Sequence, residues 1–229
     1  MHINADFSAT AFERTPGMDW VPSPTAGVER RMLDRVGGEV ARATSIVRYA
    51  AGSRFPSHTH GGGEEILVLE GLFTDEHGTY PAGTYLRNPP GSAHAPASEE
   101  GCVLFVKLWQ FAPGDDVRVV IDTGAGDWQD TRLPGVERLV LHAHGSERVA
   151  LYRLASGAVI PEHDHDGGEE VLVLDGELRD GEREYRTGDW MRFPPGSRHA
   201  VSTPNGARLY VKTGHLPPDI PQGLPDVHG

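Results

Sequence analysis

The pattern of apolar and polar positions predicts short strands rather than helices. Segments dominated by apolar and β-branched residues recur along the chain and are separated by turns rich in glycine and proline. No long window shows the spacing of an amphipathic helix. We therefore expect an all-β chain, in which the clearest strands cover residues 46–49, 65–73, 84–88, 102–109, 149–154, 170–178, 190–193 and 208–213.

The two halves of the chain are copies of one another. Residues 46–107 align with residues 151–212 at a constant shift of 105 positions, with 28 identities in 62 pairs. Upstream the match continues at a shift of 108, so three residues near Ala41 to Ala43 have no counterpart in the second copy. A repeat of this length indicates two domains. We predict domains over residues 1–114 and 115–216, followed by a Pro/Gly-rich tail over residues 217–229.

Both copies carry histidine and glutamate at one spacing, H-x-H-x3-E followed by G-x5-P-x-G-x2-H. Because side chains alternate across a strand, His58 and His60 point to the same face. The glycines after them allow a sharp bend, and a rigid Pro-Pro-Gly turn can return the last histidine to the same interior. Imidazole and carboxylate together suit transition metals. We predict one divalent transition metal per domain, with the ligands His58, His60, Glu64, His94, His163, His165, Glu169 and His199.

Three segments of the first copy carry a family resemblance. H-T-H-G-G-G-E-E-I-L-V-L-E-G, R-N-P-P-G-S-A-H and E-G-C-V-L-F-V-K-L resemble the cupin module of ChrR-type anti-sigma factors, and they are similar to the acetylacetone- and dihydroxyacetophenone-cleaving dioxygenases. The resemblance covers nearly the whole chain. It implies two tandem cupin barrels of jelly-roll type in one chain, with the family's metal ligands at the eight positions given above.

The chain departs from the ChrR pattern in one respect. ChrR-type anti-sigma factors carry a helical zinc domain with a cysteine pair ahead of the cupin, and that domain binds the sigma factor. This chain has a single cysteine, Cys102. We therefore do not expect anti-sigma activity to transfer. Cys102 is expected to be a buried small residue, with a role as an extra ligand of the first site as the alternative.

Repeated arginines are the candidates for substrate contact. Arg87 and Arg192 share a strand with the turn that delivers the last histidine, and an arginine facing the metal could bind a carboxylate or enolate. The competing interpretation is a cross-strand ion pair on the outer face, for example with Glu65 or Glu70. Asn88 of the first copy is Phe193 in the second, so the two pockets are expected to differ chemically.

Charge and composition narrow the class of partner. The formal net charge of −12 disfavours nucleic acid and membrane surfaces and leaves a small-molecule substrate as the expected partner. The N-terminus shows no apolar segment typical of a secretory signal, and one cysteine cannot form a disulfide within the chain. We therefore expect a cytoplasmic protein. The sequence leaves open whether the chain forms a homodimer.

These observations favour an enzyme. A divalent metal with three neutral histidines and one glutamate carries a net charge of about +1 and would attract an enolate or a carboxylate. We favour Fe(II), with Zn, Ni or Mn as alternatives. The expected function is that of an oxidoreductase of dioxygenase type acting on a small enolisable or carboxylate-bearing molecule. The alternative is a ChrR-like metal-binding stress sensor or regulatory module without the anti-sigma domain.

Overall fold

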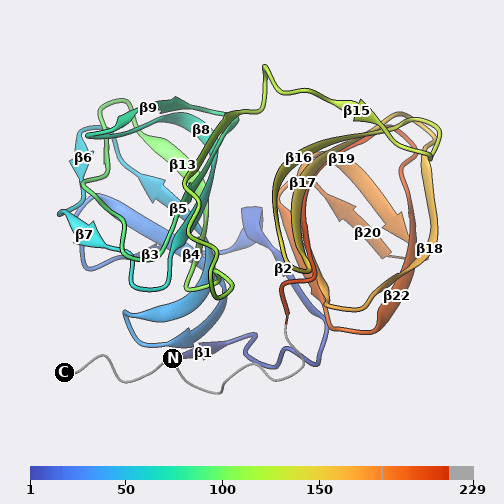
Figure 1. Cartoon of the computed structure of the whole chain (residues 1–229), viewed down its shortest axis with the longest axis horizontal. Coiled ribbons are helices and arrows are strands. Elements are labelled where there is room, and N and C mark those ends of the chain that lie inside the picture. Colours follow the sequence, from blue (N-terminus) through green and yellow to red (C-terminus); the bar gives the residue numbers. More distant parts are fainter. Residues whose placement is uncertain (182, 217–229) are drawn as a thin grey trace. The chain divides into compact units, whose positions relative to one another are not determined.

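The computed structural model of the chain describes residues 1–181 and 183–216. The predicted tail over residues 217–229 lies outside the described residues. Regular structure is almost entirely β, as predicted (Figure 1), and the helical element within the described ranges is one 3-10 turn, Thr15–Gly17. Each predicted strand coincides with an observed one, apart from Trp109 at the end of the fourth. The described part of the chain contains no helix with the length and apolar character of a transmembrane segment.

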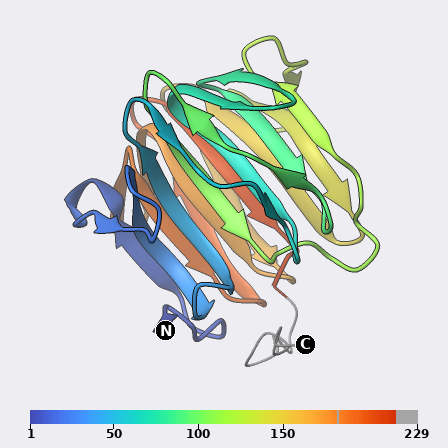
Figure 2. The same cartoon turned by 90° about the vertical axis from the view of Figure 1, so that its left-hand side faces the viewer.

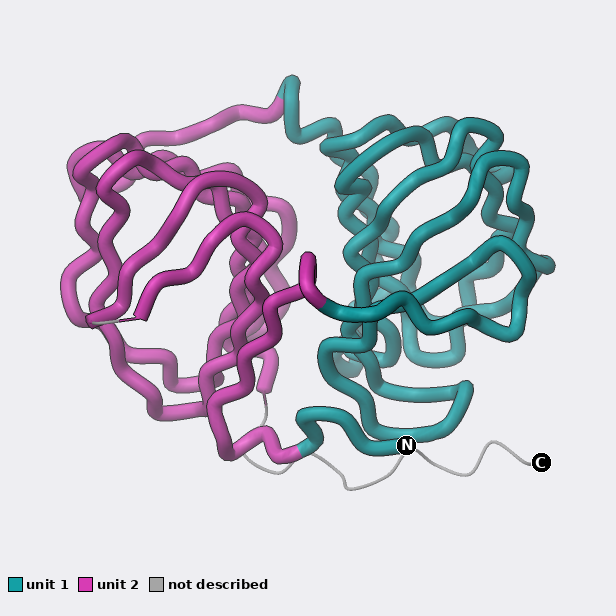
Figure 3. The backbone as a smooth tube through the Cα atoms, turned by 180° about the vertical axis from the view of Figure 1, so that it is seen from behind, with its two compact units in different colours: residues 1–5, 18–125, 221–229 teal, residues 6–17, 126–220 magenta. Residues whose placement is uncertain are grey.

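The first compact unit, unit 1, comprises Met1–Ala5 and Met18–Ala125 (Figure 3). Its main sheet is antiparallel, and Figure 2 shows its long strands running side by side. Along the sheet the order is β1 (His2–Ile3), β4 (Val28–Gly37), β5 (Ala41–Tyr49), β13 (Cys102–Leu108), β8 (Glu64–Asp75), β10 (Thr84–Asn88) and β14 (Val119–Asp122). Shorter strands complete the unit: β3 (Val21–Pro22), β6 (Ser53–Arg54), β7 (His58–Thr59), β9 (Gly78–Pro81), β11 (Ala93–His94) and β12 (Ala97–Ser98).

The second unit, unit 2, comprises Asp6–Gly17 and the described residues from 126 to 216. It repeats the strand order of unit 1 from β4 onward, and its first strand, β15, is the counterpart of β3. Its main sheet runs β15 (Gln129–Asp130), β16 (Val136–His144), β17 (Glu147–Leu154), β23 (Ala207–Thr213), β19 (Glu169–Asp180), β21 (Asp189–Phe193) and β2 (Ala11–Arg14). The remaining strands are β18 (Val159–His165), β20 (Arg183–Arg186) and β22 (Ser197–Ser202).

The edge strands of the two units are exchanged between the sequence copies. Strand β2 lies in the first copy but pairs with β21 of unit 2, and β14 lies at the start of the second copy but pairs with β10 of unit 1. The two strands are equivalent, since their residue numbers differ by 108. Each covers a sheet edge that would otherwise leave backbone groups unpaired. The predicted boundary at residue 114 follows sequence similarity, which does not show which sheet a strand joins.

Alternation along the strands separates an apolar interior from a second, polar face. In unit 1, Ile66 and Val68 of β8 belong to one buried apolar cluster with Leu86 of β10 and Leu104 of β13. Glu64, two positions before Ile66, therefore points into the same interior. Unit 2 has an equivalent cluster around Val171 and Val173. The first glutamate of each long strand is thus placed inside its unit.

Candidate metal centres

In unit 1 the four predicted ligands converge from three strands and from His60, directly after β7. His58 lies on β7 and His94 on β11, where they face one another across the strand pair, and Glu64 begins β8. The Nε2 atoms of His60 and His94 each lie 3.3 Å from Glu64 Oε2. Neighbouring ring centroids are 4.6 to 5.1 Å apart. One ligand atom from each residue lies within 4.8 Å of the others. The structure therefore brings the first predicted set together.

The other ring nitrogen of each histidine is held by an oxygen atom of the unit. Such contacts fix the ring orientation and leave Nε2 for a metal ion. The three contacts from Nδ1 are His58 to Pro56 O at 3.0 Å, His60 to Ser92 Oγ at 3.0 Å, and His94 to Asp75 Oδ2 at 3.1 Å.

The chemistry of this donor set fits a transition metal. His60 Nε2 and His94 Nε2 are buried and no well-formed hydrogen bond satisfies them. Burial lowers the pKa of His60, which favours the neutral imidazole that binds metal. Burial acts to raise the pKa of Glu64, but its contacts with His94 and His60 outweigh this and lower it to about 2. Burial acts to lower the pKa of His94, but its contacts with Glu64 and Asp75 outweigh this and raise it. Three imidazoles and an ionised carboxylate thus share one centre, a donor set that suits a transition metal.

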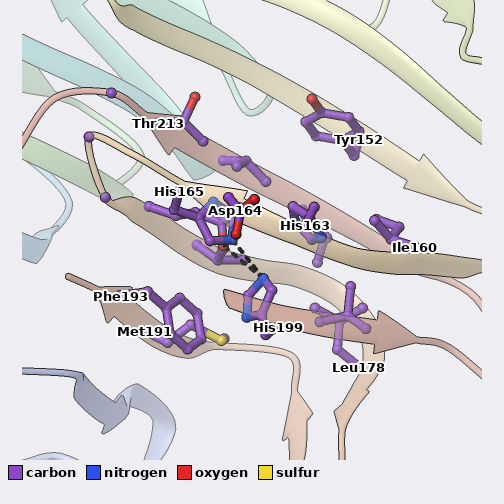
Figure 4. Close-up of a pocket in the computed structure, with 18 of the residues that line it drawn as sticks. Tyr152, Ile160, His163, Asp164, His165, Leu178, Met191, Phe193, His199 and Thr213 are labelled. Carbon is purple, nitrogen blue, oxygen red and sulfur yellow. Dashed lines mark hydrogen bonds and ion pairs between the residues drawn. The ribbon is translucent and has the colours of Figure 1, made fainter. Parts of the chain in front are cut away.

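Unit 2 brings together the second predicted set. His163 of β18 faces His199 of β22, His165 ends β18, and Glu169 begins β19. The Nε2 atoms of His165 and His199 are 3.1 Å apart, and they lie 3.4 and 3.2 Å from Glu169 Oε2. Figure 4 shows the three labelled histidines gathered at one point. Burial lowers the pKa of His165, as it does for its counterpart His60.

The surroundings of the two centres differ. In unit 1 Asn88 donates to Glu64 Oε2 at 3.2 Å, whereas its counterpart Phe193 packs against the ring of His199 with centroids 4.5 Å apart. Asp180, the counterpart of Asp75, lies 3.6 Å from His199 Nδ1, beyond hydrogen-bond distance. The histidine ring at this position is therefore held less firmly in unit 2.

This difference predicts unequal effects of removing the aspartates. We expect Asp75→Ala to weaken metal binding in unit 1 by about 10- to 100-fold, because a carboxylate on the distal ring nitrogen orients a ligand and raises its basicity. Asp180→Ala should have a smaller effect in unit 2. Chelator competition measures both, each in a background whose other centre is removed by a histidine-to-alanine change. Asp75→Asn is the control for the loop, since an amide oxygen can still accept from Tyr80 and the nearby backbone.

Each unit has a cavity lined by its candidate ligands, all four of them in unit 2 and three of the four in unit 1. The cavity of unit 2 has a volume of about 570 Å³ and includes His163, Glu169 and His199 in its wall (Figure 4). The cavity of unit 1 measures about 290 Å³ and includes His58 and Glu64. A small molecule could therefore approach either ligand set, with more room in unit 2.

The structure does not bring Arg87 to the first centre. Asn88 of β10 faces Glu64, so Arg87, one residue earlier, projects from the opposite face of the sheet. Its side chain is fully buried, and Nη1 donates to Glu65 Oε2 at 2.9 Å. Nη2 donates to Asp115 Oδ2 at 2.5 Å. These contacts agree with the ion-pair interpretation that the sequence left open.

Arg192 occupies the same position in unit 2. It is fully buried, donates to the backbone oxygen of Asp6 at 3.1 Å and lies over the ring of Phe7 with 4.1 Å to the centroid. It does not line the cavity of unit 2. Both arginines thus hold segments of their own unit against the outer face of the sheet.

Cys102 lies among the buried apolar residues of unit 1 and does not line the cavity. Burial raises the pKa of its thiol, an effect that the hydrogen bond with Ser98 opposes. We expect Cys102 to react with a thiol reagent at pH 8 only after unfolding, because the thiolate is the reactive form. Mass spectrometry with and without denaturant measures this. Rapid labelling of the folded chain would contradict the burial.

Three pairs of residues around the histidines were not singled out from the sequence. The repeat carries the signal that could have found them, because all three are identical in both copies. Residues that hold ligands must be kept with the ligands in each copy. The pairs are Pro56 and Pro161, Asp75 and Asp180, and Ser92 and Ser197.

Comparisons with known proteins agree with the fold and with the duplication. The family model of the ChrR cupin-like domain matches the chain twice, over residues 8–112 and 116–217. A comparison with curated proteins found no match.

Solved structures resemble the chain over most of its length. A putative dioxygenase from Nostoc punctiforme superposes with a TM-score of 0.77 at 15% identity, covering 95% of this chain and 86% of that one. Protein Ylba from E. coli gives 0.70 at 15%, covering 94% and 95%. A mutant of the Bacillus subtilis oxalate decarboxylase gives 0.65 at 12%, covering 89% and 77%. At these identities the likeness establishes the fold, two tandem cupin domains in one chain.

Proposed function

The chain belongs to the ChrR cupin-like domain family, and on this premise we propose that it is a metal-dependent oxidoreductase of dioxygenase type. Each unit would hold one divalent transition metal through the three histidines and one glutamate of its centre. Fe(II) is the metal we favour, and Zn, Ni or Mn would favour non-oxidative chemistry instead. The substrate would be a small enolisable or carboxylate-bearing molecule.

The observation that carries the proposal is the convergence of unsatisfied imidazole nitrogens on a carboxylate in the wall of a cavity. His60 Nε2 and His94 Nε2 are buried beside Glu64, and the equivalent atoms of unit 2 line a cavity of about 570 Å³. When bound there, a metal would supply Lewis acidity and, as Fe(II), access to dioxygen chemistry. A centre that faces a cavity suits catalysis better than a closed structural site does.

The chain's own residues would orient the substrate and exclude water. In unit 2 the wall beside the histidines is apolar, with Leu178, Met191 and Phe193 among its residues (Figure 4). Apolar walls of this kind bury the body of a ligand and strengthen electrostatic interactions at the centre. With a divalent metal bound, the single negative charge of Glu169 would leave the centre with a net charge of about +1. Such a centre would favour an enolate or a carboxylate as its ligand.

Oxygen uptake by the metal-loaded protein tests the proposal. Protein purified without oxygen and loaded with Fe(II) is screened against diketones and hydroxyketones in an oxygen electrode. The proposal expects oxygen consumption in proportion to substrate loss with Fe(II), and none with Zn or with the protein freed of metal. Filled centres with no consumption across the panel would count against a dioxygenase.

The family name favours a second candidate, a metal-binding stress sensor or regulatory module without the anti-sigma domain. Such a module would show a metal- or oxidant-dependent change in its affinity for a protein partner and no turnover. Titration with and without metal or oxidant measures this, and turnover of a small molecule separates the two candidates.

The class of partner and the location belong to the same proposal. A net charge of −12 repels phosphate backbones and anionic lipids, which favours a small molecule over nucleic acid or membrane. A single buried cysteine is compatible with the cytoplasm, which we propose as the location. A homodimer is the assembly we propose, and light scattering of the purified chain measures it.

A further inference from the structure

The cavities of the two units differ about twofold in volume, although their ligand sets match. The cavity of unit 2 measures about 570 Å³ and that of unit 1 about 290 Å³. Pockets that enclose drug-sized ligands span roughly 300 to 1,000 Å³. Unit 2 lies well within that range and unit 1 at its lower limit. An organic substrate of moderate size therefore has room in unit 2.

One equivalent position accounts for part of the difference. Trp109 of unit 1 and Gly214 of unit 2 make the same backbone hydrogen bond, to Gly63 O at 3.1 Å and to Gly168 O at 3.0 Å. The indole of Trp109 lies against the glycine loop, so that a β-carbon on Gly61 would be 2.7 Å from the ring. Both positions line their cavities, but Gly214 has no side chain to fill the space that the indole takes in unit 1.

Two further positions carry a larger side chain in unit 1, although Tyr152 and Phe193 of unit 2 are aromatic where unit 1 has Val47 and Asn88. Phe55 and Phe73 line its cavity, and the counterparts of these residues in unit 2 are Ile160 and Leu178. The smaller side chains keep the wall apolar while they leave a larger volume.

The two cavities also differ at an arginine in their walls. Arg30 of unit 1 and Arg138 of unit 2 are equivalent at a shift of 108. Arg30 Nη1 forms an ion pair with Glu39 Oε2 at 3.2 Å. Glu39 lies in the turn between β4 and β5, where the first copy has three extra residues, and Val40 of the same turn also lines the cavity. In unit 1 the guanidinium of Arg30 is therefore already paired with a carboxylate of the chain, that of Glu39.

Arg138 has a different neighbour. At the shift of 108 the residue aligned with Glu39 is Glu147, which is buried and pairs with Lys212 at 3.1 Å. Arg138 lies opposite Tyr152 in the strand pairing, and its positive charge opposes the rise that burial causes in the pKa of that tyrosine. Among the described residues no carboxylate pairs with Arg138. Arg138 is exposed and lines the cavity, so it lies at the mouth. The nearby carboxylate of Asp164 is paired with Arg198 at 2.5 Å.

From these contacts we infer that the cavity of unit 2 is the substrate site, that its ligand has an apolar body and a carboxylate, and that Arg138 binds this carboxylate at the mouth. The apolar body packs against Leu178, Met191 and Phe193 and reaches towards His199. The inference deepens the proposed function, on which it rests, by naming the class of substrate and the unit that binds it. Guanidinium and carboxylate form strong, directional hydrogen bonds.

Binding of an unreactive probe tests the inference without turnover. The probe is 4-phenylbutyrate, its neutral match is 4-phenylbutanamide, and isothermal titration calorimetry measures both on the full chain. We expect the acid to bind more tightly than the amide. Arg138→Gln should lower the affinity for the acid by at least about tenfold, as expected for loss of a hydrogen bond to a charged group. The affinity for the amide should stay unchanged.

The repeat supplies matched controls. Arg30→Gln changes the equivalent residue of unit 1 and should leave the affinity for the acid unchanged. Leu178→Phe and Ile160→Phe introduce the phenylalanines that unit 1 has at these positions. Because the larger rings fill the cavity, both variants should bind the acid and the amide less tightly. Metal content and the unfolding midpoint show that each variant keeps its fold.

The outcomes separate this inference from the proposed function. Failure of the acid to bind, an unchanged affinity in Arg138→Gln, or an equal loss in Arg30→Gln would overturn the inference. Dependence on Arg138 without oxygen uptake by any substrate would support the binding site and contradict the dioxygenase. Oxygen uptake with a carboxylate substrate whose KM is unchanged in Arg138→Gln would support the dioxygenase and contradict the role of Arg138 in binding.

Discussion

Replacing His199 by alanine is expected to lower the metal content from about two ions per chain to about one and to reduce turnover by at least about a hundredfold. His199 Nε2 lies 3.2 Å from Glu169 Oε2, so the substitution removes one of four converging donors. Loss of a donor should exceed the 10- to 100-fold effect that is typical of a residue hydrogen-bonded to a ligand. Elemental analysis and oxygen uptake measure the two quantities.

The matched variant is His94→Ala, which removes the equivalent donor from unit 1. It should also leave about one ion per chain, held in unit 2, because each ligand set lies within one unit. Turnover should largely remain, since the larger cavity is in unit 2. Loss of both ions from either variant would contradict independent centres.

Replacing Arg87 by methionine is expected to destabilise the chain by about 3 to 5 kcal/mol, the usual effect of removing one partner of a buried ion pair. Its guanidinium is fully buried between Glu65 and Asp115, and it lies over the ring of Phe111 at 4.0 Å. Methionine has a similar length, so the change removes the charge more than the volume. Two buried carboxylates then lose their common partner.

Arg48→Met is the control for this substitution. Arg48 pairs with Glu29, and both side chains are more than a third exposed. Pairs of this kind contribute at most about 1 kcal/mol. Denaturant unfolding of both variants measures the difference. An equal small effect would mean that the buried pair contributes little, and loss of turnover with intact stability would restore the catalytic interpretation of Arg87.

The duplication made the two clusters of three histidines and one glutamate predictable from the sequence. A single H-x-H pair occurs often by chance, but two copies of the same spacing indicate that all eight positions serve one purpose. The glycine bend after His60 predicted that Glu64 returns to the same interior on the next strand, and the structure places it there beside Ile66. Strand alternation, applied on β10, would have placed Arg87 on the opposite face from Asn88.

The partners of the exchanged strands could not be predicted, because strand pairing depends on contacts between residues far apart in the chain. Residues 11–14 and 119–122 occupy equivalent positions at the shift of 108, although they share no residue, and either could have paired within its own copy. Pairing within or across copies would cover the same kind of sheet edge.

The sequence showed that residues differ between the two cavities, but it did not show which cavity is the larger. The three extra residues of the first copy were evident from the change of shift, but the contact of Glu39 in that turn with Arg30 depends on how the turn folds. Trp109 was assigned to the end of a strand. The structure instead places it outside β13, with a positive φ of 58°, which turns its ring onto the glycine loop.

Metal analysis of the unmodified protein tests the central claim most directly. The chain is purified without oxygen and without added metal, and its transition-metal content is measured alongside its circular dichroism. Two converging sets of three histidines and one glutamate predict close to two ions per chain, with iron, nickel or manganese supporting a two-centre metalloenzyme. A folded chain that holds no metal, and takes none up when metal is supplied, would contradict the account.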